Sequence, residues 1–253
     1  MDLELEGRKC VLIGGSRGIG RAIALGLAAE GADVAICARS NSSLLETEAS
    51  LRQKGTKIYS AVCDAGEPVA LKKFLDDART SLGGVDVLVH NASALAMGPR
   101  VDDWEAGVKV DLMAAAHACD QVVPWMVEAG RGSILFVSSI SGLEAFPTPD
   151  YGYTTVKAGL IAYAKKLALN LGPQGIRVNA IAPGSILFPG GIWESIHREM
   201  PDLFERTLDS IPAHRFGTPE EVADVAVFLV SSRARWVAGE CVSIDGCQHR
   251  GVR

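Results

Sequence analysis

Tyr153 and Lys157 stand four positions apart in a segment that is expected to be helical. That spacing places the phenol and the ammonium on one helix face, with Cβ atoms about 5–6 Å apart. A nearby cation favours the phenolate form, so this tyrosine is a candidate for exchanging a proton near neutral pH. Ser139 lies fourteen positions earlier, at the end of a buried strand, where its hydroxyl could hydrogen-bond a substrate carbonyl. Tyr151 is a rival by position, but the residue four positions after it is the uncharged Thr155.

A glycine-rich turn follows the first buried strand and is the candidate site for a dinucleotide pyrophosphate. Gly14, Gly18 and Gly20 let the chain turn sharply, and amide N–H groups at the positive end of the next helix can then approach phosphates closely. The spacing is Gly-x3-Gly-x-Gly, which differs from the standard Gly-x-Gly-x-x-Gly. Alone the turn is a weak signal, and its weight comes from its place between a strand and a helix.

The end of the second expected strand indicates which dinucleotide binds. A chain selective for NAD usually has an acidic residue there, which binds the ribose hydroxyls. Here Arg39 takes that place and Arg17 lies in the glycine turn, so two cations are available for a 2′-phosphate. This favours NADP(H) over NAD(H), with ordinary surface arginines as the alternative. Asp64, after the third strand, could accept a hydrogen bond from the adenine amino group or could be a surface acid.

The elements that must position these residues alternate between strand and helix. Buried apolar runs predict strands at 9–13, 33–37, 57–62, 85–90, 132–138, 176–181 and 241–244. Helical periodicity predicts helices near 18–30, 41–54, 67–82, 103–129, 151–171 and 219–231. This order predicts an α/β fold: a single doubly wound Rossmann-type domain over residues 1–253, with a seven-stranded, mainly parallel sheet flanked by helices on both faces. Residues 185–215 form a long insertion with an apolar-faced helix.

Composition limits the possible classes of protein. Hydrophobic residues make up 48% of the 253 residues and charged residues 22%, which is typical of a soluble globular protein. No apolar run reaches the ~20 residues of a membrane span, and the acidic amino terminus argues against a secretory signal. Six cysteines without CxxC spacing predict reduced thiols and no metal site, so we expect a cytoplasmic protein. The net charge of −5 argues against nucleic acid as a partner.

With these features in order, the chain resembles the classical short-chain dehydrogenases/reductases over essentially its whole length, in particular their 3-oxoacyl-reductase-like members. Seven landmarks carry the resemblance: Gly14 to Gly20, His90-Asn91-Ala92-Ser93, Ser139, Tyr153 with Lys157, Asn179 to Gly184, Arg215 to Glu221, and Asp245-Gly246.

The resemblance implies hydride transfer between nicotinamide C4 and a carbonyl or carbinol carbon. It implies that Tyr153 is the acid and base, that Ser139 orients and polarises the substrate oxygen, and that Lys157 binds the nicotinamide ribose. The implied cofactor-binding residues are Gly14, Ser16, Arg17, Gly18, Ile19, Gly20, Arg39, Asp64, Asn91, Ala92, Tyr153, Lys157, Pro183, Gly184 and Ile186. The substrate pocket is expected to contain Glu144, Tyr151, Phe188 and Trp193. The family also implies a homotetramer, with a homodimer as the alternative.

Five residues near the expected site depart from the family pattern, and three of them, Ile13, His90 and Ser93, are expected to affect local hydrogen bonds more than chemistry. Asp111, which we count among the catalytic residues, stands where the family usually has an asparagine that completes a proton relay through water to the lysine. An ionised Asp111 would stabilise Lys157 but oppose the phenolate by like charge, which predicts slower turnover or a higher working pH. Alternatively, the aspartate can hold the same water as an acceptor. Phe188 stands where the family often places a threonine that bonds the cofactor, and Ser185 is a candidate to compensate.

The sequence therefore predicts an NADP(H)-dependent oxidoreductase that acts on an apolar or aromatic ketone or secondary alcohol, because the 185–215 segment is strongly apolar. One alternative is an NAD-linked alcohol dehydrogenase of the same family. Another is a 3-oxoacyl-(acyl-carrier-protein) reductase, which is disfavoured because Gln174 stands where such reductases commonly have a basic residue. A third is a low-turnover cofactor-binding scaffold, motivated by Asp111.

Overall fold

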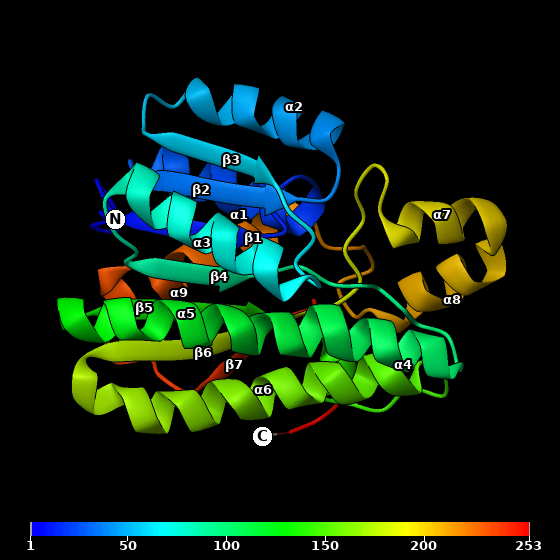
Figure 1. The fold of residues 1–253 in the computed structure, drawn as a ribbon. Coiled ribbons are helices and arrows are strands. Elements are labelled where there is room, and N and C mark those ends of the chain that lie inside the picture. The colour runs from blue at the N-terminus through cyan, green and yellow to red at the C-terminus, as the bar shows by residue number, and fades with distance from the viewer. Residues whose placement is uncertain (1, 253) are drawn as a thin grey trace.

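The fold is a parallel sheet between two layers of helices (Figure 1). The computed structural model describes residues 2–252. Its strands are β1 (Lys9–Ile13), β2 (Asp33–Ala38), β3 (Ile58–Val62), β4 (Val87–His90), β5 (Gly132–Val137), β6 (Ile176–Pro183) and β7 (Cys241–Ile244). They form a seven-stranded sheet in the order β3-β2-β1-β4-β5-β6-β7, and neighbouring strands run parallel. The predicted fold class is confirmed.

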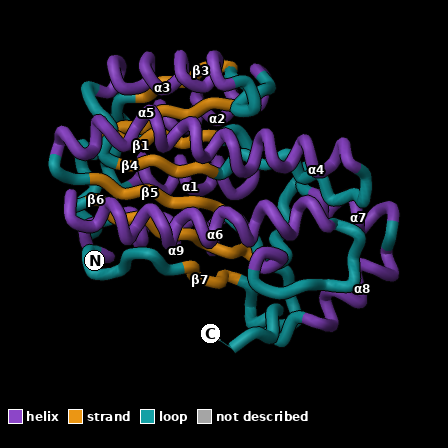
Figure 2. Tube along the Cα trace, turned by 60° about the horizontal axis from the view of Figure 1, so that its bottom comes forward, coloured by secondary structure: helices purple, strands orange, loops and turns teal. Residues whose placement is uncertain are grey.

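Helices cover both faces of the sheet (Figure 2). One face carries α3 (Pro68–Leu82), α5 (Ala114–Ala129) and α6 (Tyr151–Leu171), and the other carries α1 (Gly18–Ala29), α2 (Asn41–Arg52) and α9 (Pro219–Val230). Because both faces are covered, the central strands read as continuous apolar runs instead of alternating patterns. This is why β1 and β4 were recognisable from sequence.

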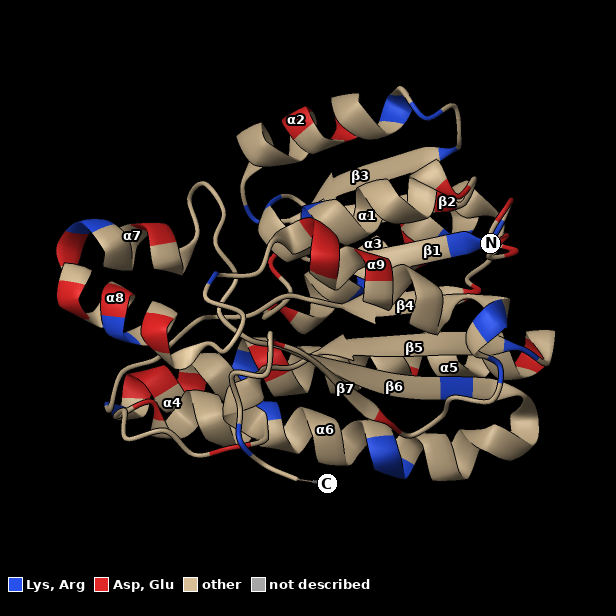
Figure 3. Ribbon diagram, turned by 180° about the vertical axis from the view of Figure 1, so that it is seen from behind, with Lys and Arg blue, Asp and Glu red and all other residues tan. Residues whose placement is uncertain are grey.

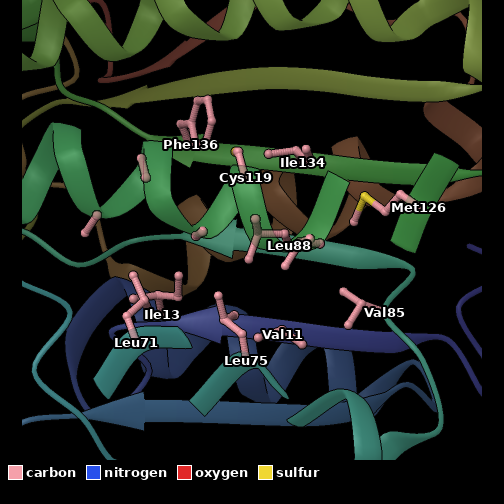
Figure 4. Close-up of a cluster of buried hydrophobic side chains, with 14 of the residues drawn as sticks. Val11, Ile13, Leu71, Leu75, Val85, Leu88, Cys119, Met126, Ile134 and Phe136 are labelled. Atoms are coloured by element: carbon pink, nitrogen blue, oxygen red, sulfur yellow. The ribbon is translucent and has the colours of Figure 1, made fainter. Parts of the chain in front are cut away.

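A layer of aliphatic and aromatic side chains joins the sheet to α3 and α5 (Figure 4). Leu71 and Leu75 of α3 point at β1, while Cys119 of α5 faces β5. Phe136 of β5 is fully buried and stacks on Tyr163 of α6, with ring centroids 5.5 Å apart. This packing fixes the end of β5, and the residues that follow it belong to the candidate site.

The order in which strands are added to the sheet reverses at β1: β2 and β3 lie on one side of it, and β4 and the later strands lie on the other. In open α/β sheets, the carboxyl ends of the strands at such a switch point form the binding crevice. Helices α7 (Ile192–Glu199) and α8 (Pro201–Ser210) lie beyond these strand ends (Figure 1). The predicted insertion thus faces the expected site, but it forms two helices instead of one, because Pro201 cannot continue α7 and begins α8.

A second difference concerns the segment predicted as one helix at 103–129. The structure has α4 (Val101–Gly107), then a wider π-helical stretch at Val108–Met113, then α5. Such π-helical turns are frequent at functional sites, and this one contains Asp111.

Charged residues lie mainly on helices and loops, and those on β1, β2 and β6 lie near the strands' amino ends (Figure 3). Among residues 2–252, no helix is both long enough and apolar enough to cross a membrane.

Candidate active site

A buried ion pair joins two of the candidate residues. The Nζ of Lys157, on α6, lies 2.9 Å from Oδ1 of Asp111, and the two side chains are 3% and 1% exposed. The same Nζ donates a hydrogen bond to the carbonyl of Val137, at the end of β5 (3.1 Å). Burial lowers the pKa of Lys157, but the negative charge of Asp111, with a further contribution from Tyr153, outweighs burial, so the pKa is raised. Lys157 is therefore held charged in a place that water hardly reaches.

Asp111 is anchored on its other side by the loop after β4. Its Oδ2 accepts a hydrogen bond from the N–H of Ala94 (2.9 Å), and its backbone carbonyl lies 3.0 Å from Nε2 of His90. His90 is fully buried, and this burial lowers its pKa to about 4. The ring is neutral at physiological pH, and because a carbonyl only accepts, Nε2 carries the proton. Within residues 2–252, Nδ1 of His90 has no hydrogen-bond partner.

We expect acid to destabilise the protein through His90. Because burial lowers its pKa from 6.5 to about 4, the unfolded chain binds a proton in this range that the folded chain does not. The free energy of unfolding should fall by up to about 3 kcal/mol from this residue as the pH drops through that range. His90→Asn removes the titrating group, so it should flatten the fall. Urea denaturation at neutral pH and near pH 4 measures this, and an unchanged pH dependence in the variant would contradict it.

Tyr153 lies one helical turn before Lys157 on α6. The Nζ of Lys157 is 5.5 Å from the centroid of its ring, and the tyrosine is half-buried. Tyr151, in contrast, is 58% exposed, and the hydroxyl of Thr155 donates to its backbone carbonyl (2.8 Å). Of the two tyrosines, Tyr153 is the one that lies beside the buried cation.

Ser139 is placed against the same turn of α6. Its Oγ accepts a hydrogen bond from the N–H of Ser141 (3.1 Å), which leaves its own proton available for a ligand. The next hydroxyl back, that of Ser138, donates to the backbone carbonyl of Lys157 (2.8 Å). Gly142 allows this close approach, since a Cβ there would lie 2.7 Å from the carbonyl carbon of Lys157. The segment that carries Ser139 is thus packed directly on the helix that carries the lysine.

The glycine turn after β1 packs tightly on the loop after β4. Gly14 has a φ of +87°, and a Cβ there would lie 2.8 Å from the amide nitrogen of Ala92. Asn91 donates from Nδ2 to the Gly14 carbonyl (2.7 Å), and a Cβ at Gly20 would collide with both of these groups. The carbonyl of Ser16 accepts from the hydroxyl of Thr47 on α2 (2.9 Å). The turn is therefore held in place from two sides.

The start of α1 fits a dinucleotide pyrophosphate. The helix begins at Gly18 with Arg17 in the N-cap position, and no side chain in the described part of the chain caps it. Its first N–H groups and its positive end are thus available for an anion. Ile19, in the first turn, packs against the core beneath. Arg39 follows β2 and is exposed, and Asp64 follows β3, where its Oδ1 accepts from the N–H of Gly66 (2.9 Å). Arg39 and Asp64 thus lie beyond β2 and β3, where the adenosine end of a dinucleotide is expected.

The loop after β6, residues 184–191, is called the substrate loop because the resemblance places substrate-pocket residues in it, and it rests on the glycine turn. A Cβ at Gly18 would lie 2.5 Å from the ring of Phe188, so this ring lies against the turn. Nη1 of Arg17 donates to the carbonyl of Gly190 (3.2 Å). Phe188, which the resemblance places in the substrate pocket, therefore also contacts the expected cofactor loop.

The remaining predicted residues lie around this loop. Pro183 ends β6, and the N–H of Gly184 donates to the carbonyl of Ile244 in β7 (2.9 Å). Ile186 is buried and packs on Gly217.

Two further predicted pocket residues are engaged with neighbouring segments. The ring centroids of Trp193 and Phe216 are 5.0 Å apart. Both rings belong to a small cluster that also includes Phe204 and Ile211. Glu144 follows the short turn after Ser139, and its Oε2 accepts from the N–H of Arg250 (2.7 Å).

Comparison with known proteins agrees with this geometry. Residues 14–249 match the family model described as "Enoyl-(Acyl carrier protein) reductase". The chain is 33% identical over 252 residues to an isoepoxydon dehydrogenase of Penicillium expansum, covering 98% of this chain and 97% of that protein. It is 34% identical over 249 residues to a 3-oxoacyl-[acyl-carrier-protein] reductase of Thermotoga maritima, covering 96% and 98%.

Solved structures give the same result. L-sorbose reductase from Gluconobacter frateurii, complexed with NADPH and L-sorbose, superposes with a TM-score of 0.89 at 31% identity over 100% of both chains. A 7α-hydroxysteroid dehydrogenase complexed with NADH superposes with a TM-score of 0.90 at 29% identity, covering 97% of this chain and 96% of that one. Fold and site define a Rossmann-type oxidoreductase. The chain belongs to the short-chain dehydrogenase/reductase family, whose alcohol and ketone chemistry the relatives' names reflect.

Proposed function

We propose that the protein is an NADP(H)-dependent oxidoreductase that interconverts apolar ketones and secondary alcohols. The observation that carries this proposal is the arrangement around α6: Lys157 is held charged one turn after Tyr153, and Ser139, with its proton free, belongs to a segment packed on the same helix. A positioned acid and a hydrogen-bond donor are what carbonyl reduction requires of a protein.

In the reducing direction, the hydroxyl of Ser139 donates a hydrogen bond to the substrate carbonyl oxygen, and the hydroxyl of Tyr153 donates a proton to it. The nicotinamide, when bound, supplies the hydride to the carbonyl carbon or accepts it in the reverse reaction. Tyr153 is left as a phenolate, which the positive charge of Lys157 stabilises until a proton arrives from solvent. In the oxidising direction, the same phenolate removes the alcohol proton.

Asp111 weakens this stabilisation because its carboxylate neutralises Lys157 at 2.9 Å. Asp111 also contacts the ammonium of Lys157 directly, whereas the family's asparagine is expected to act on the lysine through a water. We therefore propose that Asp111 keeps the lysine charged and in place, and that it lowers the rate at neutral pH compared with an amide at the same position.

The preference for NADP(H) is supported by Arg39, an exposed cation directly after β2, and by Arg17 in the glycine turn. The relatives do not decide between the cofactors, since one of the two solved structures described above contains NADPH and the other contains NADH. The absence of an acid at the end of β2 is the specific feature of this chain that favours the phosphorylated cofactor.

Arg39→Glu tests the cofactor proposal. Because a charge-assisted hydrogen bond contributes about 1.5–3 kcal/mol, the Kd for NADPH should rise at least about tenfold. The Kd for NADH should stay within about twofold, and cofactor fluorescence on binding measures both. Arg206→Glu makes the same charge change on the exposed surface of α8 and is the matched control. An equal change for both cofactors would show that Arg39 does not contact the 2′-phosphate.

The proposed substrate is small and apolar because the substrate loop and the helices after it expose apolar side chains. Leu187, Ile192 and Met200 are 38%, 37% and 48% exposed. Helices α7 and α8 also carry several acidic residues (Figure 3). These carboxylates would repel an acidic carrier protein, so a free small molecule is favoured over an acyl carrier.

We also propose a homotetramer or homodimer in the cytoplasm. Trp236 and Leu169 are 98% and 66% exposed, and apolar groups this open are typical of surfaces that a second copy covers. The buried thiols of Cys10, Cys37 and Cys119 fit a reducing compartment.

A further inference from the structure

The segment that follows β7, residues 245–250, forms a compact turn held by Asp245. Its Oδ1 accepts from the N–H of Cys247 (3.1 Å), and its Oδ2 accepts from the N–H of His249 (2.9 Å). The same Oδ2 lies 2.5 Å from Nδ1 of His249, and both side chains are nearly buried, at 7% and 13% exposed. The turn is therefore a fixed part of the fold and not a loose end.

From this turn, the side-chain amide of Gln248 reaches the start of the substrate loop. Its Oε1 accepts from the N–H of Ser185, and its Nε2 donates to the hydroxyl of Ser185, both at 2.9 Å. Gly184 lies directly beside it, because a Cβ there would be 2.8 Å from the same Oε1 and 2.6 Å from Cβ of Asp245. One amide thus uses both its acceptor and its donor on a single residue, which fixes the point where the loop leaves β6.

Two residues further on, the turn contacts the segment that follows Ser139. The N–H of Arg250 donates to Oε2 of Glu144 (2.7 Å). Glu144 is in turn held on the short turn after Ser139, since its N–H donates to the carbonyl of Ile140 (3.0 Å). The segment that carries Ser139 and the root of the substrate loop are therefore joined through the same six residues.

We propose that residues 245–250 form a clasp that sets the width of the substrate cleft, and that Gln248 is a positioning residue that determines which substrate sizes are accepted. This rests on the proposed function, in which Ser139 contacts the substrate oxygen and the apolar loop after Gly184 lines the substrate site, so that the cleft is the space between these two segments. The clasp is short, since only His249 lies between Gln248 and Arg250, the two residues that make the contacts, so it cannot stretch without breaking one of them. A cleft held at one width favours substrates that fill it.

Gln248→Ala removes both hydrogen bonds to Ser185, so residues 245–250 no longer tie the substrate loop to the segment after Ser139. We expect kcat/KM for a compact ketone such as cyclohexanone to fall at least about fivefold, mainly through a higher KM. The value for a fused bicyclic ketone should change by less than about twofold, because a wider cleft still holds it. Val252→Ala is the control, since this side chain is 100% exposed and lies beyond the clasp.

Hydrogen exchange followed by mass spectrometry tests the clasp without any turnover. In Gln248→Ala, peptides covering 184–191 and 140–146 should both exchange at least about fivefold faster, while peptides of β1 stay unchanged. If the wild type reduces no ketone, the proposed function fails, but the exchange experiment still decides on the clasp. An unchanged exchange rate in either the 184–191 or the 140–146 peptides would overturn the clasp. An equal loss of kcat/KM for both ketones would overturn the role in substrate size.

Discussion

Replacing Tyr153 with phenylalanine is expected to lower kcat by about 10³-fold or more while leaving cofactor binding nearly unchanged. The substitution removes only the phenolic oxygen, which is the group that gives a proton to the substrate oxygen and takes it back. Positioned acids and bases contribute typically about 10²–10⁴-fold to the rate, and here Lys157, 5.5 Å from the ring centroid, has no other tyrosine beside it in the described part of α6. Initial rates with NADPH and a ketone measure the loss.

Tyr151→Phe is the matched control, because it makes the same chemical change two positions earlier on the same helix. Its side chain is 58% exposed, so we expect kcat to change by less than about threefold. The Kd for NADPH should stay within about twofold in both variants, which separates chemistry from binding. Comparable losses in the two variants would contradict the assignment of Tyr153 as the acid.

Replacing Asp111 with alanine is expected to cost about 3–5 kcal/mol in the free energy of unfolding. The change leaves the ammonium of Lys157, 3% exposed, without its counter-charge, and an uncompensated buried charge is among the most destabilising defects in a protein. Because the pKa of Lys157 is raised on folding, the ion pair stabilises the fold throughout the neutral range. That contribution is lost only as the pH rises through the folded pKa of the lysine. Urea denaturation monitored by circular dichroism measures the difference.

Two further variants test whether the missing counter-charge of Lys157 causes the loss of stability. Asp111→Ala combined with Lys157→Met removes both charges, so it should recover much of the lost stability. Asp111→Asn keeps the shape and an acceptor oxygen for the lysine, and turnover near neutral pH should be preserved or raised, because the charge that opposes the phenolate is gone. A large loss of turnover in this variant would show that the carboxylate has a specific role in the reaction. A loss of stability under about 1 kcal/mol in Asp111→Ala would contradict the buried ion pair.

The sheet could be predicted from sequence because its strands are short, apolar and separated by turn residues. β1 and β4 are buried on both faces, so they appear as uninterrupted hydrophobic runs. The π-helical stretch around Asp111 could not be predicted, because apolar periodicity does not separate a π turn from the α-helix on either side. The break at Pro201 was visible as a proline, but the surrounding apolar pattern favoured one continuous helix.

The candidate site was partly predictable. The four-residue spacing of Tyr153 and Lys157 is a local pattern, and helix geometry converts it directly into proximity. The contact between Lys157 and Asp111 depends on how α6 packs against the π-helical stretch, which lies 46 positions earlier in the chain. His90 was expected to influence only local hydrogen bonds, and the structure adds its contact with the Asp111 carbonyl.

Other contacts gave no signal in the sequence. The carbonyl of Val137 and the N–H of Ala94 are backbone groups, which every residue has, so their contacts with Lys157 and Asp111 follow only from the fold. Gln248 belongs to no motif, and its role in holding Ser185 depends on a turn whose shape comes from Asp245.

The most direct test of the proposed function is the rate of NADPH oxidation by the purified protein with a panel of apolar ketones, accompanied by measurement of the alcohol formed. We predict that at least one ketone is reduced with one alcohol formed per NADPH consumed, and that NADH supports a lower kcat/KM. Tight NADPH binding without turnover on any ketone would contradict an enzyme of this specificity and support the cofactor-binding scaffold. A clear preference for NADH would contradict the role assigned to Arg39.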